Sequence, residues 1–248
     1  MQLLVSVRSA AEVGPALSGG ADIVDAKEPA RGSLGRVSPA TLAEILARMP
    51  PECPFSIALG DMISPKEVIL AMASLDLPVR PARTYLKLGF AGVRSPEMAT
   101  RILETAVATV AETGSSALVV AVAYADAARV GTLPPELIAD SARRAGAAGV
   151  LLDTHTKDGL GLLGWLAPHS LAGWVASARS QGLLTALAGA LTLENVEAVS
   201  AAGADVIGVR GAACEGGRQG QVTAKRVHLL RQRVAAFGFC SPIGAPTR

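Results

Sequence analysis

Short apolar runs alternate with longer amphipathic segments along the chain. The runs are rich in Val, Ile, Leu and Ala on both faces, which is typical of parallel strands buried between helices. Eight runs are predicted to be strands: 3–7, 21–26, 55–60, 84–89, 117–125, 149–154, 183–188 and 204–209. Apolar residues at helical spacing follow the runs, as in Leu42, Ile45, Leu46 and Met49, and in Val227, Leu230, Val234 and Phe237. The pattern therefore predicts repeated strand–helix units.

Several of the predicted helices begin with recognisable start signals. A hydroxyl that can cap the helix stands before a proline at Ser38-Pro39, Ser64-Pro65 and Ser95-Pro96. Ser64 with Glu67, and Ser9 with Glu12, also have the spacing of a capping box.

Eight such units in 248 residues predict a (β/α)8 TIM barrel, an α/β fold, formed by a single domain over residues 1–248. A doubly wound open sheet is the alternative. It is disfavoured because the first strand leads into "VSVRSAAE", which lacks a glycine-rich turn.

Composition narrows the classes of partner. The net charge of +2 comes from no basic block and aromatic residues make up 3% of the chain, so no nucleic-acid partner is expected. The N-terminus lacks the pattern of a signal peptide, and no apolar run approaches the roughly 18 residues of a membrane span. We therefore expect a cytoplasmic protein that does not contact a membrane. Cys53, Cys214 and Cys240 lack the spacing of a disulfide framework or a zinc site, and no metal or other cofactor is expected.

Lysines occupy unusual places in this chain. Only five of the 23 basic residues are lysines, and three of them, Lys27, Lys87 and Lys157, lie in or just after predicted strands. Active sites of such barrels form where the strands end. Asp25 shares a strand face with Lys27, and Asp153 shares one with Lys157 if the chain stays extended. Asp61, which ends the third strand, is a further candidate for this group.

Two interpretations of these strand ends are open. The charged residues can form ion pairs that pack the mouth of a barrel, or they can be catalytic. Crowded, partly desolvated lysines favour the loss of one proton, and a neutral amine can attack a carbonyl to form a Schiff base. A charged neighbour can then transfer protons, while Asp25 and Asp153 orient the amines.

The last two strands predict an anion site. Gly189, Gly208 and Gly211 permit close approach of a ligand to the backbone, at the place where barrels commonly bind phosphate. Arg210 is a candidate bidentate ligand, and Arg218 follows in a glycine-rich loop. The alternative is a set of tight turns with a solvated arginine. The first interpretation implies a phosphorylated carbonyl substrate.

Three further residues have two interpretations each. His155 lies between Asp153 and Lys157 and is either an acid or base or a supporting loop residue. Tyr85 and Tyr124 lie on predicted strands, where core packing is favoured over a position facing the site.

The motifs together resemble the (5-formylfuran-3-yl)methyl phosphate synthases of methanofuran biosynthesis. The matching stretches are "GADIVDAKEPARGSLG", "IALGD", "YLKLGF", "YADA", "LLDTHTKDG", "ALAGAL" and "DVIGVRGAACEGGR". They follow the order of that family from the second strand to the eighth, so the resemblance covers nearly the whole chain.

The resemblance implies a TIM barrel that condenses two molecules of glyceraldehyde 3-phosphate into a phosphorylated furan aldehyde, with loss of phosphate and water. It implies that Lys27 forms the Schiff base and that Lys87 is the general acid and base. Asp25, Asp153 and Lys157 match further motif residues of the active site.

Two rival functions remain open. The same lysine could serve an ordinary Schiff-base aldolase or sugar-phosphate isomerase, or the barrel could bind a phosphorylated metabolite without catalysis. In each case the expected partner is a small phosphorylated molecule. The Ala-rich helices could pack between subunits or simply lie close to the barrel. A homo-oligomer is expected.

Overall fold

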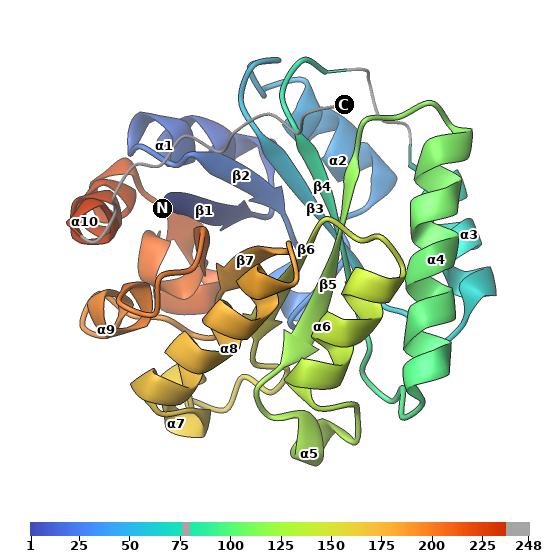
Figure 1. Ribbon diagram of the computed structural model, residues 1–248. Helices are drawn as coiled ribbons and strands as arrows, with labels where there is room; N and C mark the ends of the chain where they lie inside the picture. The colour runs from blue at the N-terminus through green and yellow to red at the C-terminus, as the bar shows by residue number, and fades with distance from the viewer. Residues whose placement is uncertain (76–79, 237–248) are drawn as a thin grey trace.

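Eight parallel strands close into a barrel in the computed structural model, which describes residues 1–75 and 80–236 (Figure 1). The strands are β1 (Gln2–Val7), β2 (Ile23–Ala26), β3 (Phe55–Asp61), β4 (Thr84–Gly89), β5 (Leu118–Tyr124), β6 (Gly149–Asp153), β7 (Leu184–Leu187) and β8 (Val206–Val209). Each strand pairs with the next, and β1 also pairs with β8, which closes the sheet. The predicted (β/α)8 fold is confirmed, and an open doubly wound sheet is excluded. Phe237 and Cys240 lie outside the described residues.

Helices follow the strands and surround the barrel (Figure 1). They are α1 (Val13–Ser18), α2 (Pro39–Leu46), α3 (Pro65–Ala73), α4 (Pro96–Glu112), α5 (Ala127–Val130), α6 (Pro135–Arg144), α7 (Leu162–Trp165), α8 (Pro168–Ser180), α9 (Val196–Ser200) and α10 (Ala224–Ala235). The short helices α5 and α7 belong to the loops after β5 and β6 and mark the carboxyl end of the barrel, at the bottom of Figure 1. A two-stranded antiparallel sheet, β9 (Cys214–Glu215) with β10 (Gln221–Val222), extends the loop after β8.

The predicted helix caps form at α2, α3 and α4. The hydroxyls of Ser38, Ser64 and Ser95 each accept the N–H group three residues later, at 3.1, 3.4 and 3.2 Å. The capping box predicted at Ser9 and Glu12 was wrong, because the Ser9 side chain makes no capping hydrogen bond. Glu12 instead accepts the N–H of Arg8 at 2.8 Å and turns toward the loop after β8, where it meets an arginine.

Alternation along the strands divides the core into two layers. In β5, Val119, Ala121 and Ala123 pack outward against the helices, whereas Val120, Val122 and Tyr124 point into the barrel. This period of two places one apolar set on each face of the closed sheet. The interior face carries the residues that form the site.

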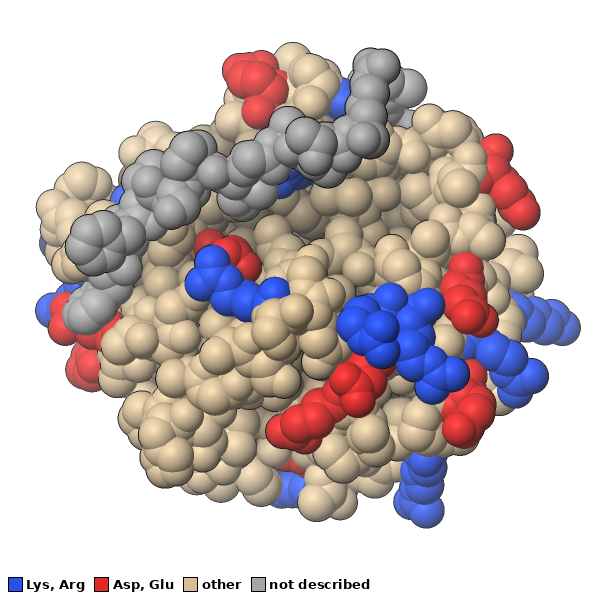
Figure 2. Space-filling view, in the orientation of Figure 1, with Lys and Arg blue, Asp and Glu red and all other residues tan. Residues whose placement is uncertain are grey.

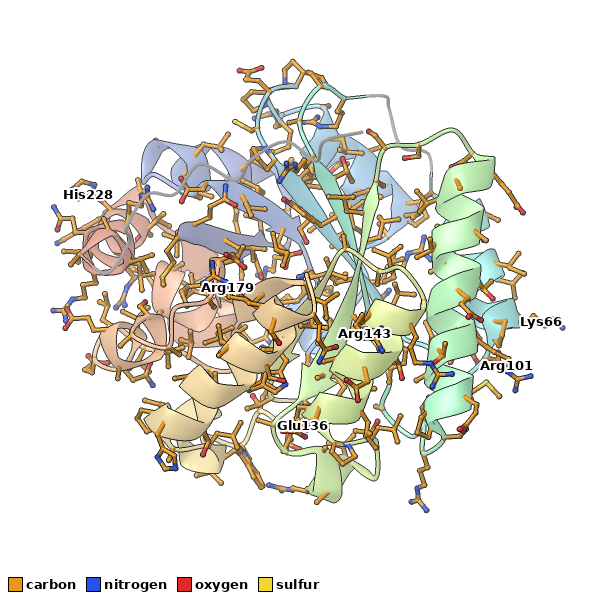
Figure 3. All side chains as sticks on the ribbon, in the orientation of Figure 1. Lys66, Arg101, Glu136, Arg143, Arg179 and His228 are labelled. Atoms are coloured by element: carbon orange, nitrogen blue, oxygen red, sulfur yellow. The ribbon has the colours of Figure 1, made fainter. Side chains whose placement is uncertain are left out.

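The outer surface mixes both signs of charge. Basic side chains gather over α6, whose last turn holds Arg143 and Arg144, and acidic side chains lie beside them (Figure 2). Lys66 lies on α3 at the outer edge of the molecule and points away from the strands (Figure 3). Ile63, Ile69 and Leu70, in or just before α3, are more than half exposed. The expected homo-oligomer stays a prediction. None of the described helices is long and apolar enough to cross a membrane.

Candidate active site

A pocket of about 430 Å³ opens at the carboxyl end of the barrel and brings distant segments of the chain together. The predicted residues that line it are Lys27, Lys87, Asp153, Lys157, Gly189, Gly208, Arg210 and Gly211. Asp25 is fully buried beside them. These side chains lie together because the carboxyl ends of all eight strands surround one rim when the barrel closes.

Asp25 in β2 and Lys87 in β4 form a buried ion pair on the inner face of the barrel. The Lys87 amine lies 2.7 Å from Oδ1 of Asp25, and the Ser6 hydroxyl donates to Oδ2 at 2.8 Å. Burial alone would raise the pKa of Asp25, but the charges of Lys87 and Lys27 and these hydrogen bonds together lower it. Asp25 therefore stays ionised, and its partner is the lysine of β4.

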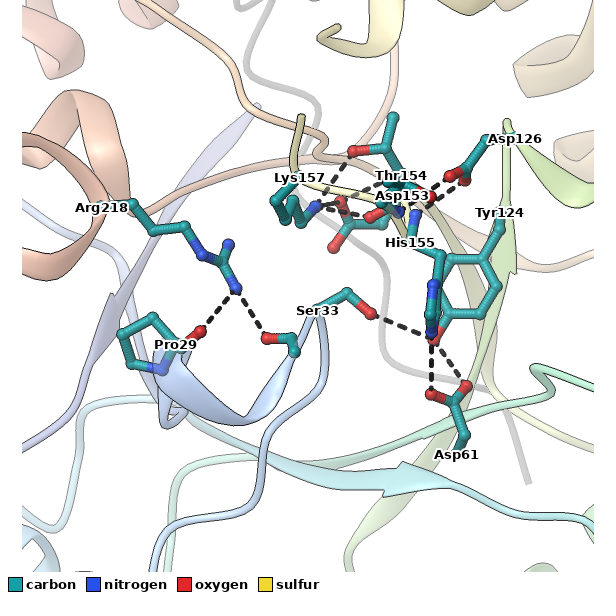
Figure 4. Close-up of polar contacts among 12 residues, drawn as sticks. Pro29, Ser33, Asp61, Tyr124, Asp126, Asp153, Thr154, His155, Lys157 and Arg218 are labelled. Atoms are coloured by element: carbon teal, nitrogen blue, oxygen red, sulfur yellow. Dashed lines mark hydrogen bonds and ion pairs between the residues drawn. The ribbon is translucent and has the colours of Figure 1, made fainter. Parts of the chain in front are cut away.

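A second pair holds Lys157. Its amine donates to Oδ1 of Asp153 at 2.8 Å and to the hydroxyl and carbonyl oxygens of Thr154 at 3.0 and 2.5 Å (Figure 4). Burial would raise the pKa of Asp153, but the charges of Lys157 and Lys27, with hydrogen bonds from Lys157 and Thr154, lower it. Like Asp25, Asp153 remains a carboxylate.

The loop that carries Lys157 is anchored by Asp126. This buried carboxylate accepts the N–H of His155 at 2.7 Å and the N–H of Thr156 at 2.8 Å (Figure 4). Sequence reasoning assigned Asp126 no role, although it belongs to the motif "YADA" just after β5. An acidic residue at the end of a barrel strand was the available signal.

Lys27 differs from the other two lysines of the pocket. It is 7% exposed, and its amine makes no ion pair with any carboxylate in residues 1–75 and 80–236. Burial lowers its pKa from 10.5 to about 8; Asp153 and Asp25 oppose this shift, and the positive charges of Lys87 and Lys157 add to it. The lowered pKa raises the neutral fraction of this amine at pH 7 by roughly 300-fold, to about one molecule in ten.

The glycines at the ends of β7 and β8 bring backbone close to the pocket. Gly189 has a φ of +115°, and a Cβ there would lie 3.2 Å from atoms of Leu162 and Thr154. Gly208 faces the interior, where a Cβ would lie 3.3 Å from Cβ of Ala188. Gly211 begins the short 3-10 turn Gly211–Ala213. These positions leave peptide groups accessible to a ligand at this side of the rim.

Arg210 lines the pocket, but its guanidinium is bound within the protein. It forms a buried bidentate pair with Glu12, at 2.5 and 3.0 Å. Its remaining N–H groups donate to the carbonyl oxygens of Ser6, Gly220 and Arg218 at 3.0, 2.8 and 3.2 Å. All five N–H groups are therefore used, and in this conformation none is free for the direct anion contact that was expected. The network instead ties the loop after β8 to β1.

Two other arginines face the pocket. One terminal nitrogen of Arg218 donates to the carbonyls of Pro29 and Gly32 at 3.2 and 2.6 Å, which joins this loop to the segment after Lys27 (Figure 4). Arg226, in the first turn of α10, also lines the pocket. Sequence reasoning named Arg218 and missed Arg226, because only the packing of α10 shows which face of that helix meets the rim.

A polar cluster lies beside the lysines, around Tyr124 (Figure 4). The Tyr124 hydroxyl donates to Oδ1 of Asp61 at 2.7 Å and accepts from Ser33 at 3.4 Å. Burial and the Asp61 charge raise the pKa of Tyr124. His155 lies 3.7 Å from Oδ2 of Asp61, and its ring meets that of Tyr124 edge-on. Asp61 thus bonds to Tyr124 and approaches no lysine within ion-pair distance in the described part of the chain.

Comparison with known proteins identifies the family. A sequence profile described as 4-HFC-P synthase matches residues 3–231. The chain belongs to the 4-HFC-P synthase family. Among 4-HFC-P synthases, the (5-formylfuran-3-yl)methyl phosphate synthase of Methanothermobacter thermautotrophicus is 37% identical over 239 residues, covering 96% of this chain and 100% of that protein. A Streptomyces griseus protein, provisionally given the same enzyme name, is 41% identical over 212 residues, or 85% of this chain and 84% of that one.

Solved structures support the fold of this 4-HFC-P synthase family member. The 3-hexulose-6-phosphate synthase of Salmonella typhimurium superposes with a TM-score of 0.64 at 15% identity, covering 96% of this chain and 100% of that one. The motif resemblance is confirmed, and the synthase names of the relatives support an enzymatic role. Within residues 1–75 and 80–236, no group of three or more His, Cys, Asp or Glu is arranged to hold a metal ion.

Proposed function

We propose that the protein condenses two molecules of glyceraldehyde 3-phosphate into (5-formylfuran-3-yl)methyl phosphate through a Schiff base on Lys27. The reaction releases one phosphate and two waters and needs no change of oxidation state overall. The product would serve the synthesis of a methanofuran-type cofactor. The names of the relatives support the product, and the state of the Lys27 amine supports the mechanism.

The observation that carries the proposal is the contrast among the three lysines. Lys87 and Lys157 form ion pairs with Asp25 and Asp153, and the positive charges of both lysines help to lower the pKa of Lys27. A neutral amine attacks the substrate carbonyl and expels water to give an iminium, which acidifies the adjacent C–H bond. Loss of that proton yields an enamine carbon that can attack the aldehyde of the second triose.

Lys87 is the proposed general acid and base. Its amine is buried and fixed by Asp25, so it can protonate the oxygen that forms when the enamine attacks. Elimination of phosphate, closure of the ring and loss of water follow, and formation of the aromatic furan drives the sequence forward. Asp25, Asp153 and Lys157 hold the charges in place around Lys27.

The phosphate end is proposed to lie at the rim between β7 and β8. Peptide groups of Gly189, Gly208 and Gly211 line this side, and Arg218 and Arg226 supply positive charge. Arg210 contributes indirectly, since its bond to the Arg218 carbonyl holds the loop that carries Arg218.

Borohydride trapping tests the covalent step. Incubation with glyceraldehyde 3-phosphate and borohydride should add the mass of one reduced triose phosphate to the wild type and to Lys66→Ala, and none to Lys27→Ala. Lys66 is a matched control because it lies exposed on α3. Equal trapping in both variants would place the reactive amine elsewhere.

Product analysis separates the rival functions. A furan synthase releases inorganic phosphate and an ultraviolet-absorbing aldehyde. An aldolase or isomerase would be trapped by borohydride and release neither. A barrel that only binds a phosphorylated metabolite would gain no covalent mass at all.

A further inference from the structure

The pocket continues past the lysines into the barrel, toward the amino-terminal ends of the strands. Inward positions that fill other barrels with large side chains hold small residues here, among them Ser56, Ala186 and Gly208. Leu4 and Ile23 also line the pocket. Leu4 precedes Ser6 by two residues in β1, and Ile23 precedes Asp25 by two residues in β2. The cavity therefore reaches deeper than the Asp25–Lys87 pair.

Two hydroxyl groups face this deep part of the pocket. Ser56 lies in register with Asp25 on one side and with Tyr85 on the other. Ser56 is fully buried, and its hydroxyl has no hydrogen-bond partner among the described residues. Tyr85 also lines the pocket, and its hydroxyl forms no hydrogen bond with the described part of the chain. Ser6, one strand away, differs because its hydroxyl binds Asp25.

A buried hydroxyl without a partner is uncommon and calls for an explanation. Ser56 lies beside the Asp25–Lys87 pair, and the rest of this part of the pocket is lined by apolar side chains such as Val120, Leu151 and Val206. Such walls disfavour a phosphate group, whose charge would lose its hydration. A neutral oxygen on an apolar skeleton suits this part of the pocket, since it can accept hydrogen bonds from both hydroxyl groups.

We propose that Ser56 and Tyr85 form a subsite for a neutral hydroxyl or carbonyl oxygen at the end of the ligand far from its phosphate. The ligand class is a furanylmethyl phosphate or its open-chain precursor, with the carbon skeleton inside the barrel and the phosphate at Arg218 and Arg226. This inference rests on the proposed function for the identity of the ligand. Ser56 and Tyr85 then determine which ring substituent the pocket accepts.

Two unreactive ligands that differ by one oxygen test the subsite. Neither [5-(hydroxymethyl)furan-3-yl]methyl phosphate nor (5-methylfuran-3-yl)methyl phosphate has an aldehyde, so neither forms a Schiff base. Calorimetric titration of the wild type should show about 30-fold tighter binding of the hydroxymethyl ligand, the combined effect of two hydrogen bonds. Ser56→Ala and Tyr85→Phe should each lower this preference about fivefold and keep their affinity for the methyl ligand.

Ser200→Ala is the matched control. Ser200 is also buried, and its hydroxyl has no hydrogen-bond partner among the described residues, but it lies in α9 and does not line the pocket. This variant should keep the wild-type preference. The subsite is overturned if the wild type does not bind the hydroxymethyl ligand, if it binds both ligands equally, or if Ser56→Ala leaves the preference intact.

These outcomes are independent of the proposed reaction. Trapping at Lys27 with equal binding of the two ligands would refute the subsite and leave the synthase mechanism standing. A hydroxyl-dependent preference without furan formation would support the subsite and refute the mechanism.

Discussion

Replacing Lys27 by methionine should change how the stability of the protein depends on pH. In the folded protein the pKa of Lys27 is about 8, against 10.5 for an unperturbed lysine. Below pH 8 both the folded and the unfolded chain hold this proton. Between pH 8 and 10.5 the unfolded chain holds it while the folded protein has lost it, so the wild type gains stability as pH rises.

The size of the effect follows from the shift. A difference of 2.5 between 10.5 and 8 corresponds to about 3 kcal/mol over the whole window. Between pH 7 and pH 9.5 the expected part is about 2 kcal/mol. The Lys27→Met variant lacks this contribution, so the wild type should gain about 2 kcal/mol relative to the variant over that interval.

Urea unfolding at the two pH values measures this difference, with Lys66→Met as the control for loss of a surface lysine. The titration of Lys27 can also be observed directly by carbon NMR, because only five lysines would appear in the spectrum of protein labelled at the lysine ε-carbon. The resonance absent from Lys27→Met should have its midpoint near pH 8.

Two substitutions test what lowers the pKa of Lys27, because each should move that pKa in a known direction. Asp153→Asn removes the charge that most opposes the shift and should lower the Lys27 midpoint, whereas Lys87→Met removes a repelling charge and should raise it. A stability difference between wild type and Lys27→Met that is the same at pH 7 and 9.5 would refute the reasoning. So would a Lys27 midpoint that neither substitution moves.

Three other substitutions, two of them with a matched control, test by thermal or urea unfolding how the site is held together. Arg210→Met leaves Glu12 buried without its partner and should cost about 3 kcal/mol or more, whereas Arg233→Met, in the half-exposed pair with Glu197, should cost less than about 1 kcal/mol. Gly89→Ala places a Cβ against Asp61 and Tyr124 and should cost about 1–3 kcal/mol. Its control is Gly173→Ala on the exposed face of α8, where a Cβ would meet no atom of the described residues within 4 Å; this variant should be neutral or stabilising. Asp126→Ala removes the acceptor of two loop N–H groups and should cost at least about 2 kcal/mol. Equal costs within either matched pair, or an unchanged Asp126→Ala variant, would contradict the packing described.

The sequence alone determined the order of the eight barrel strands, their limits to within about two residues, and the first residues of α2, α3 and α4. These features depend on neighbouring residues: the period of two in β5, or the Ser-Pro start of α4, is complete within a few positions of the chain. It also placed Lys27 and Lys87 at the carboxyl end of the barrel, since the carboxyl ends of all strands in a parallel barrel lie on the same face.

The tertiary structure decided the partners of each charge. Asp25 lies two residues before Lys27 but binds Lys87, because the register of β2, β3 and β4 brings the Asp25 and Lys87 side chains together on the inner face of the barrel. Glu12 has the spacing of a capping residue, yet it lies beside Arg210 because β1 and β8 are neighbours. Pairings between residues far apart in sequence depend on register and on side-chain reach, which no local pattern encodes. For the same reason, only the closed barrel shows that Lys27 has no ion partner among the described residues and that Ser56 faces a hollow interior.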